Sequence, residues 1–251
     1  MQRVDLLLVE QHLADTRTQA QRLLKEGRVS YSTGGKSQVI TKPGLKLPDD
    51  TLFTVKDDPS DHYVSRGALK LKGALEEFNI DITGMIAIDV GQSTGGFTDC
   101  LIQAGAAQVV GIEVGHDQLA ERLRTHPAVH CYEGMNAREL PASLLTHTQG
   151  NGFDVAVMDV SFISQTKILP SLSPLLRTGG TLISLVKPQF EVGKEGIGKG
   201  GIVKDTRLFA NVEHLIRTCC HDNHLHVEGY MESPITGGDG NHEFLLWAVK
   251  Q

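Results

Sequence analysis

The sequence predicts an α/β protein in which a mainly parallel β-sheet, covered by helices, follows a small N-terminal α+β domain. From about residue 62 onward, apolar segments of strand length alternate with segments of helical periodicity. The apolar segments are almost continuously hydrophobic, which is typical of strands in a parallel, helix-covered sheet. We expect strands at residues 85–90, 108–113, 128–132, 153–159, 180–186, 225–231 and 243–249.

The last two of these strands are expected to form an antiparallel pair. The segment between them is too short to hold a crossover helix, whereas parallel neighbours need a connection of about a dozen residues or more. An antiparallel last strand therefore completes a sheet whose other connections are of the parallel kind.

The N-terminal 58 residues are predicted to form a compact domain of two helices and short strands. The apolar spacing from Val4 to Leu13 indicates a first amphipathic helix. Thr16–Gln19 has the form of a capping box that opens a second helix, which stops at Gly27. Short strands are expected at 28–31 and 52–55, and a turn is expected at 33–36.

A linker and a change of charge separate this domain from the rest of the chain. Asp57–Asp61 has the composition of a linker, so we divide the chain into residues 1–58, a linker at 59–62 and residues 63–251. The net charge is −6, but the first 72 residues carry 12 Lys and Arg against 9 Asp and Glu, and the remainder carries 12 against 21. This asymmetry is compatible with a basic binding module attached to an acidic enzyme body.

The composition argues against a membrane protein and against a metal site. No apolar run approaches the roughly 18–20 residues that span a bilayer, and the apolar stretch Leu6–Val9 is too short for a signal peptide. We therefore expect a cytoplasmic protein that has no membrane partner. The four cysteines show no framework spacing, which favours reduced thiols. Adjacent Cys219 and Cys220 lack the spacing of zinc ligands, so we expect no metal.

The most informative stretch is residues 87–99, an apolar strand followed by a glycine-rich turn and a helix. Small residues in the turn let a ligand approach the backbone closely. The glycine spacing, G-x-x-x-G-G, differs from the dinucleotide fingerprint, and Asp89 just before Gly91 would repel a pyrophosphate. A carboxylate there suits a cationic ligand such as S-adenosylmethionine, and Glu113, at the end of the next strand, is placed to hold ribose hydroxyls. The alternative is an ordinary strand–turn–helix connection without a ligand.

Four ionisable residues fall where an open α/β sheet binds its ligands. Asp159 and Lys187 end the fourth and fifth expected strands, Glu243 opens the last strand, and Lys70 lies in a helix before the first. The carboxyl ends of strands face the ligand crevice of such a sheet. A surface or structural ion pair explains any one of these residues better than catalysis does, but the four together favour a catalytic group.

These four residues resemble the lysine–aspartate–lysine–glutamate tetrad of ribose 2′-O-methyltransferases. The chain as a whole resembles the TlyA (hemolysin A) family of ribosomal RNA methyltransferases, which has an FtsJ-like methyltransferase domain. The matching stretches are YVSRGALKL, DVGQSTGGFTD, MDVSFIS, LVKPQFEVGK and GNHEFLLW, between residues 63 and 247. Residues 15–29, with Gly27-Arg28-Val29, resemble the small RNA-binding domain typified by ribosomal protein S-four. Three sites depart from these patterns: Tyr31–Gly34 replaces a Val-Asn-Gly turn, Gln92 replaces a small residue, and Glu113 replaces an aspartate, with a longer side chain that should still reach ribose hydroxyls.

The resemblance implies a Rossmann-like methyltransferase sheet and S-adenosylmethionine-dependent 2′-O-methylation of a cytidine in ribosomal RNA, within ribosomal subunits. Members that modify only the large subunit tend to have short termini, and the chain ends four residues after Trp247, which favours the large subunit. The residues expected to hold the cofactor are Asp89, Gly91, Ser93, Thr94, Gly95, Gly96, Phe97, Glu113, Asn136 and Asp159.

The chemistry explains why two lysines and two acids are needed. A ribose hydroxyl is a poor nucleophile, so the protein must align oxygen, methyl and sulfur and must remove or stabilise the departing proton. Lys187 is the expected base, and the nearby charge of Lys70 would favour its neutral form. Asp159 and Glu243 would instead raise the pKa values of the two lysines, and they would fix the ammonium groups in place. The alternative is that Lys187 only steers the hydroxyl through a hydrogen bond.

Basic residues are expected to hold the RNA. Several of them share one polar face of the second predicted helix, and a glycine-rich segment at 191–201 is expected to be a mobile loop that closes over the RNA backbone. Solvated helix faces and a surface loop without a ligand are the alternatives. The expected RNA contacts are Arg3, Arg17, Arg22, Lys25, Arg28, Arg66, Arg138, Lys194 and Lys199.

Two other functions compete with RNA methylation. The family's older name implies a membrane-active hemolysin, but the sequence has neither an apolar span nor a strongly amphipathic cationic helix. The second rival is an RNA-binding ribosome-assembly factor whose catalytic domain is impaired, and Gln92 is the one residue that suggests it.

Overall fold

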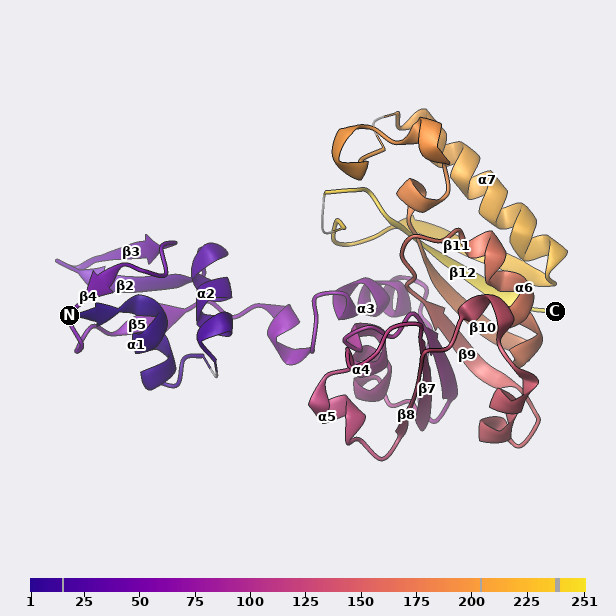
Figure 1. The fold of residues 1–251 in the computed structure, drawn as a ribbon, viewed down its shortest axis with the longest axis horizontal. Coiled ribbons are helices and arrows are strands. Elements are labelled where there is room, and N and C mark those ends of the chain that lie inside the picture. Colours follow the sequence, from indigo (N-terminus) through magenta and orange to yellow (C-terminus); the bar gives the residue numbers. More distant parts are fainter. Residues whose placement is uncertain (15, 204, 238–239) are drawn as a thin grey trace. The chain divides into compact units, whose positions relative to one another are not determined.

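The computed structural model describes residues 1–251 except residues 15, 204 and 238–239. Asp15, the first residue of the S-four-like segment, therefore lies outside the described residues. The chain divides into two compact units, Met1–Asp61 and His62–Gln251 (Figure 1). The division falls within the segment 59–62 that the sequence suggests as a linker.

The first unit packs two helices against a small antiparallel sheet. The helices are α1 (Val4–Glu10) and α2 (Arg17–Lys25), and the sheet has the order β3-β2-β5, formed by Lys36–Ile40, Val29–Thr33 and Phe53–Val55. A two-residue pair, β1 (Gln2–Arg3) with β4 (Lys46–Leu47), completes the unit. Its core contains leucines from both helices together with Val29 and Phe53.

The predicted start and end of α2 agree with the structure. The side chain of Thr16 accepts a hydrogen bond from the backbone N–H of Gln19 at 3.2 Å, which satisfies one of the free donors at the helix start. The helix ends before Gly27, which has a φ of +69°. Strand β3 was not expected from the sequence, because four of its five residues are exposed and show no apolar alternation.

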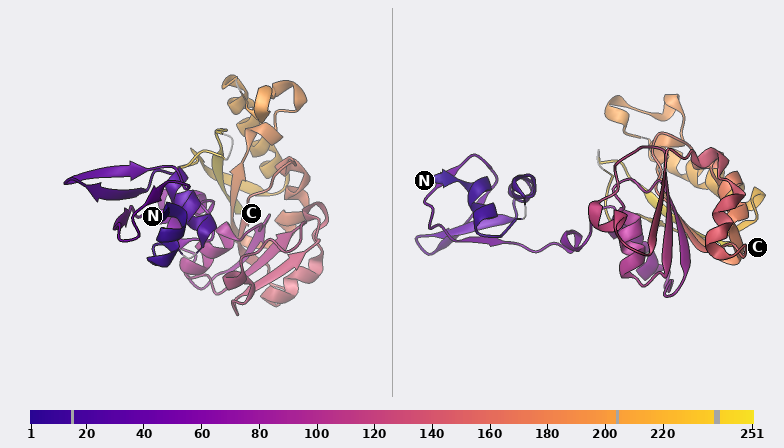
Figure 2. Two further views of the ribbon diagram at one scale, coloured as in Figure 1. Left: turned by 60° about the vertical axis from the view of Figure 1, so that its left-hand side comes forward. Right: turned by 60° about the horizontal axis from the view of Figure 1, so that its bottom comes forward.

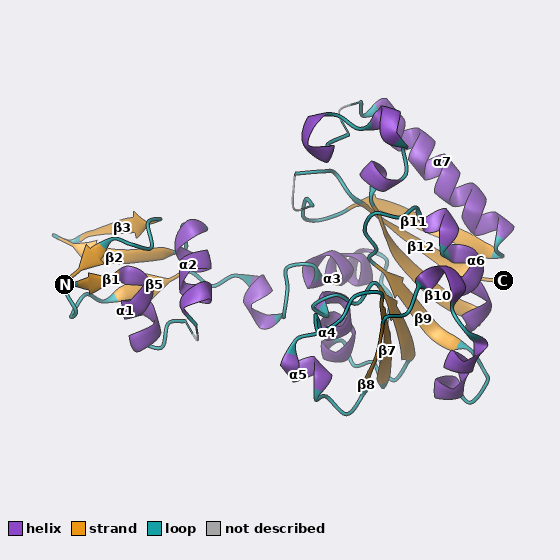
Figure 3. Cartoon of the chain, in the orientation of Figure 1, coloured by secondary structure: helices purple, strands orange, loops and turns teal. Residues whose placement is uncertain are grey.

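The second unit is a seven-stranded sheet in the order β11-β12-β10-β9-β6-β7-β8 (Figure 3). Strands β8, β7, β6, β9 and β10 pair in parallel, and β12 runs antiparallel to both of its neighbours, β10 and β11. All seven expected strands are confirmed within a few residues. Their bounds are β6 Ile86–Val90, β7 Gln108–Glu113, β8 Val129–Glu133, β9 Phe153–Met158, β10 Leu176–Val186, β11 Leu225–Glu232 and β12 Phe244–Lys250.

Helices cover both faces of this sheet (Figure 2). One apolar cluster joins α3 and α4 to Val155 and Val157 of β9, and the other joins α6 and α7 to Ala156 and Met158 of the same strand. Side chains alternate between the two faces of a strand, so a strand with two covered faces is apolar throughout. The α-helices are α3 Ala68–Glu77, α4 Gly96–Gln103, α5 Glu121–Arg124, α6 Leu169–Leu172 and α7 Arg207–Asp222.

Short 3₁₀ turns occur between these elements, at Pro59–His62, Ala137–Glu139, Ala142–Thr148, Gln165–Lys167, Ser173–Leu175, Pro188–Phe190, Lys194–Gly196 and Lys199–Gly201. Among the described ranges of the chain, no helix is long and apolar enough to cross a membrane.

Candidate active site

The loops that follow β6 and β9 cross at very short range. Gly91, directly after β6, has a φ of +85°, a left-handed conformation that favours glycine. A Cβ atom at Gly91 would lie 2.4 Å from the carbonyl oxygen of Asp159, and the backbone N–H of Asp159 donates to the carbonyl of Val90 at 3.0 Å. The lack of a side chain at Gly91 therefore lets Asp159 lie directly against the glycine-rich turn.

Two pockets adjoin at this edge of the sheet. The larger, of about 510 Å³, is bordered by the ends of β6, β7 and β9. The smaller, of about 160 Å³, is bordered by the glycine-rich turn, the start of α4 and Lys187. Because Gly91, Ser93, Asp159 and Ser161 line both, the two pockets form one continuous site at the carboxyl ends of the parallel strands.

Glu113, at the end of β7, is held in one orientation on the floor of the larger pocket. One carboxylate oxygen accepts the backbone N–H of Ser93 and the other accepts the backbone N–H of Gly115, both at 2.8 Å. Each oxygen has a further lone pair, so the carboxylate can also accept hydroxyl donors from a ligand. This geometry suits the expected role of Glu113 in holding ribose hydroxyls.

The rest of the larger pocket is mainly apolar. Ile112, Met135, Ile163 and Ile168 line it, together with Asn136. The side-chain oxygen of Asn136 accepts the backbone N–H of Arg138 at 3.1 Å, which fixes the start of the following turn. Apolar walls with a few oriented polar groups are typical of small-molecule sites.

Asp89 lies beneath the glycine-rich turn and is not among the residues that line either pocket. It is fully buried, and the hydroxyl of Thr98 donates to one of its carboxylate oxygens at 2.6 Å, whereas the other has no hydrogen-bond partner among the described residues. Burial raises the pKa of Asp89 to about 7; the bond from Thr98 opposes this shift and the charge of Asp159 adds to it. Asp89 therefore supports the turn from below and does not border the pocket as the sequence suggested.

Gln92 turns its side chain into the core beneath the same turn. It is 3% exposed, and its Nε2 donates to the Thr98 hydroxyl at 2.8 Å. The strand opposite leaves room for it, since a Cβ atom at Gly111 would lie 2.0 Å from the Gln92 carboxamide. The core therefore accommodates the larger side chain at this position. In the described part of the chain, the Oε1 of Gln92 has no hydrogen-bond partner.

We predict that Asp89→Asn changes how stability depends on pH. The native protein keeps the Asp89 proton from the ordinary pKa of 3.8 up to about 7, whereas the unfolded chain has lost it. The stabilising contribution of the proton is therefore complete below pH 3.8 and is lost as the pH rises to 7, on the order of 4 kcal/mol. Chemical denaturation of both proteins from pH 4 to 8 should show the variant gaining stability relative to the wild type as the pH rises. An equal difference at every pH would contradict this expectation.

The four residues of the expected tetrad form two ion pairs at one end of the sheet. The Nζ of Lys187 lies 2.6 Å from the Oδ1 of Asp159, and the Nζ of Lys70 lies 2.5 Å from the Oε2 of Glu243. Val186 of β10 pairs with Phe244 of β12, so Lys187 and Glu243 leave neighbouring strands at the same level. Helix α3, which carries Lys70, packs against both strands.

The two pairs differ in their access to the site. Lys187 and Asp159 both line the smaller pocket, whereas Lys70 and Glu243 line neither pocket and are almost completely buried. The Nζ of Lys187 also donates to the hydroxyl of Ser161 at 3.0 Å. An ammonium has three N–H donors, so Lys187 keeps a donor for a group that enters the pocket.

Most of the expected cofactor residues border the site, and some residues that border it were not expected. Ser93, Thr94, Gly96 and Phe97 line the smaller pocket; Gly95 does not, and a Cβ atom there would meet Leu119 at 2.7 Å and Leu123 at 2.4 Å. The residues missed from the sequence include Ser65, Gly67, Gln118, Ser161 and Phe162. Ser65, Gly67, Ser161 and Phe162 lie in the stretches YVSRGALKL and MDVSFIS, but spacing along the chain did not mark these residues as neighbours of the glycine-rich turn.

The basic residues of the first unit are partly engaged within the protein. Arg28 is 9% exposed and binds both Asp61 and the carbonyl of Lys56. Arg3 and Arg17 bind the buried Asp5, and these bonds lower the pKa of that carboxyl well below its usual range. These three side chains therefore hold their own unit together, with Arg28 the least accessible.

The other expected RNA contacts are more accessible. Arg22 is half exposed and lies 3.9 Å from Asp61, and Lys25 is exposed at the end of α2. In the second unit, Arg66, Arg138, Lys194 and Lys199 are all exposed. Arg138 lines the larger pocket.

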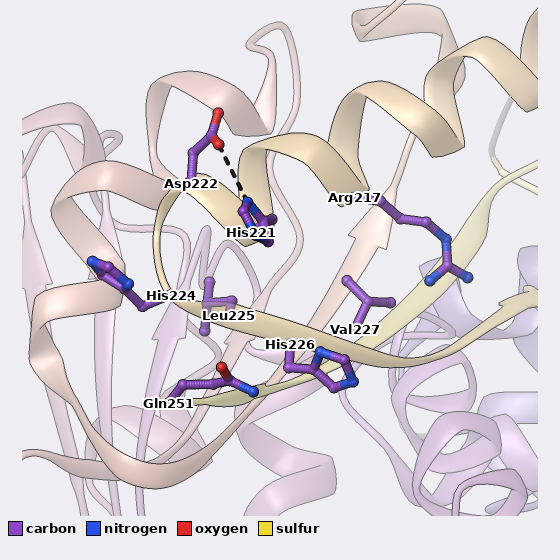
Figure 4. A pocket seen from close by; sticks show the side chains of 8 residues that line it. All are labelled: Arg217, His221, Asp222, His224, Leu225, His226, Val227 and Gln251. Carbon is purple, nitrogen blue, oxygen red and sulfur yellow. Dashed lines mark ion pairs between the residues drawn. The ribbon is translucent and has the colours of Figure 1, made fainter.

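A further pocket of about 510 Å³ lies where α7 ends and β11 begins, away from the carboxyl ends of the parallel strands (Figure 4). Three of its cationic or titratable groups already face acids: Arg217 binds Glu213, His221 lies 3.5 Å from Asp222, and His226 lies 4.0 Å from Glu228. Within the described part of the chain, no three His, Cys, Asp or Glu side chains are grouped to hold a metal ion. The four cysteines are free.

The sequence is similar to a family of methyltransferases and to individual proteins over almost its full length. The family model described as FtsJ-like methyltransferase matches residues 63–250. YqxC of Bacillus subtilis (strain 168), provisionally described as an rRNA methyltransferase, is 46% identical over 246 residues, which cover 98% of this chain and 84% of YqxC. The 16S/23S rRNA (cytidine-2′-O)-methyltransferase TlyA of Mycobacterium tuberculosis is 42% identical over 249 residues, which cover 99% of this chain and 90% of that protein.

One solved structure is similar to this chain both in sequence and in fold. It is a protein of Streptococcus thermophilus that is provisionally described as a hemolysin, and it is 41% identical with a TM-score of 0.77. The match covers 100% of this chain and 88% of that one.

Proposed function

Because this chain belongs to the TlyA family of FtsJ-like methyltransferases, we propose that it transfers a methyl group from S-adenosylmethionine to the 2′-hydroxyl of a cytidine in ribosomal RNA. The observation that carries the proposal is the position of Lys187. Its amine lies beside Asp159 and Ser161 at the junction of the two pockets, where a ligand in the larger pocket would meet a second ligand.

The pocket fits the proposed cofactor. S-adenosylmethionine supplies, when bound, an electrophilic methyl group on a cationic sulfur. Glu113 would accept its ribose hydroxyls, and the apolar wall near Ile112 and Met135 would hold its base. The carboxylate of Asp159, which lines both pockets, would face the positive end of the cofactor. Two carboxylates that line one mainly apolar pocket suit a cationic nucleoside.

Lys187 would handle the proton of the acceptor. The ion pair with Asp159 and the hydrogen bond to Ser161 hold its amine in place. In the neutral form its lone pair would accept the proton of a ribose hydroxyl, and in the ammonium form it would donate a hydrogen bond to the oxygen. The buried ion pair of Lys70 and Glu243 is neutral overall, and the carboxylate of Glu243 fixes the Lys70 ammonium at this end of the sheet. Orientation of the hydroxyl by these groups supplies much of what an in-line displacement needs.

The first unit is proposed to bind the RNA. Arg22 and Lys25 present an accessible basic face on α2, and Arg66, Arg138, Lys194 and Lys199 add exposed cations in the second unit. Such side chains would contact phosphate and position the substrate without reading its sequence. We propose RNA of the large ribosomal subunit as the substrate. The proposed location is the cytoplasm, where ribosomal subunits are found.

The test uses purified ribosomal subunits and labelled S-adenosylmethionine. We expect label in RNA of the large subunit, recovered after digestion as 2′-O-methylcytidine. Protein with Lys187→Ala, prepared in the same way, controls for methyltransferases that copurify. Label on nucleobases or only on protein would overturn the proposed reaction, and label confined to the small subunit would overturn the proposed substrate.

A further inference from the structure

The loops after β9 and β10 are joined by hydrogen bonds that lie outside both pockets. Gln165, in the loop after β9, contacts β10 through both ends of its carboxamide. Its Nε2 donates to the carbonyl of Leu185 at 2.6 Å, and its Oε1 accepts the hydroxyl of Ser184 at 2.9 Å. Gln165 is 2% exposed and Ser184 is fully buried, so water does not compete for these bonds.

Glu191, in the loop after β10, gives the loop after β9 a second attachment. Its carboxylate accepts the hydroxyl of Ser164 at 2.6 Å and the backbone N–H of Gln165 at 2.9 Å. Burial raises the pKa of Glu191, and the two hydrogen bonds oppose that shift. Because Ser184 precedes Lys187 and Glu191 follows it, the loop after β9 is attached to the chain on both sides of Lys187.

The proposed reactive groups lie next to these hydrogen bonds, and Lys187 lies between the two attached positions Ser184 and Glu191. Asp159 and Ser161 lie on the loop after β9, upstream of Gln165, and both contact Lys187. A single ion pair between part-exposed side chains gains little and does not fix two loops relative to one another. The hydrogen bonds of Gln165 and Glu191 are better shielded from water than that ion pair, and they join the loop after β9 to the chain on both sides of Lys187. They therefore set the distance between Lys187 and Asp159.

We propose that Gln165 is a positioning residue, which acts with Glu191 to hold the Asp159–Ser161 segment against Lys187. This inference rests on the proposed function, since it assigns Gln165 a part in presenting the proposed base. Gln165 acts through Lys187 and Asp159, and it lines neither pocket. Misplacing a reacting group by about 1 Å costs up to about a hundredfold in rate.

Two variants test the effect on the rate. Gln165→Leu keeps the volume of the side chain and removes both bonds to β10, and Ser184→Ala removes one of them. We expect the kcat of methyl transfer to fall at least about tenfold in Gln165→Leu and by a smaller factor in Ser184→Ala. Ser184→Ala keeps the test meaningful where Gln165→Leu folds poorly.

A matched control separates positioning from general stability. Ser173 is also buried, and its hydroxyl donates to the carbonyl of Asn223 at 2.6 Å, where α7 ends. Ser173→Ala removes this bond, and also the bond that the hydroxyl accepts from Lys250 at 2.9 Å, far from Lys187. It should lower the melting temperature and leave kcat unchanged.

A second readout does not need RNA. The Lys187 side chain is 11% exposed in its ion pair, so its acetylation by acetic anhydride, followed by mass spectrometry, should be slow. We expect labelling of Lys187 to rise severalfold in Gln165→Leu and to stay unchanged in Ser173→Ala. Unchanged labelling together with a kcat within about twofold of wild type would overturn the positioning role. If the wild type fails to methylate ribosomal RNA, the proposed function fails, and the labelling result still decides the role of Gln165.

Discussion

Replacing Lys187 with alanine is expected to abolish methyl transfer while the protein still binds S-adenosylmethionine. Loss of a general base typically lowers a rate by about 10²–10⁴-fold, and Lys187 is the cation whose amine meets both Asp159 and Ser161 in the smaller pocket. It does not line the larger pocket, where we place the nucleoside. Transfer to ribosomal RNA, measured as 2′-O-methylcytidine, and calorimetric titration with S-adenosylmethionine check the two halves of this expectation.

The control for this variant is Lys72→Ala, which removes an exposed lysine of α3 whose partner is Glu76 at 3.4 Å on the next turn. Such an exposed pair contributes little to stability, so this variant should keep full activity. In Lys187→Ala, Asp159 loses its ion-pair partner, but water still reaches its side chain, which is 23% exposed. We therefore expect the fold to persist. Turnover within tenfold of the wild type would remove Lys187 from the reaction.

The fold could be predicted closely because its signals are local. Central strands of the large sheet such as β6 and β9 are almost continuously apolar, whereas β8 and β11 alternate polar and apolar residues. The capping box at Thr16 reports a helix start within four residues. Strand β3 was missed for the same reason, because its exposed side chains give no such signal and its pairing with β2 decides its conformation.

The candidate site could be predicted only where a motif carries it. Glu113 is the last residue of β7 and Asp159 directly follows β9, and their position at strand ends is enough to bring them to the pocket. The partners of Arg28 and the contacts of Gln165 depend on residues more than 15 positions away, and spacing along the chain does not reveal them. Asp89 shows a related failure: its place in the motif suggested a contact with the ligand, whereas burial beneath the turn gives it a supporting role.

Gly91→Ala is expected to weaken binding of S-adenosylmethionine by at least tenfold, and to lower methyl transfer further. Alanine at a φ of +85° costs about 1–2 kcal/mol, and its Cβ would also lie 2.4 Å from the carbonyl oxygen of Asp159. That oxygen belongs to a backbone tied to Val90 by a hydrogen bond, so it cannot move without Asp159. The strain therefore displaces a residue that lines both pockets. Calorimetric titration with the cofactor measures the loss.

Gly150→Ala separates the two contributions to this loss. Gly150 has a φ of +83°, nearly the same as Gly91, but a Cβ atom there would meet nothing within 4 Å. Both variants should lose similar stability from the left-handed backbone, and only Gly91→Ala should lose cofactor affinity, because only there does the new methyl group meet the Asp159 backbone. Equal cofactor affinity in the two variants would mean that the turn can move away from Asp159 without disturbing the pocket. The close crossing of the two loops would then not be what shapes the site.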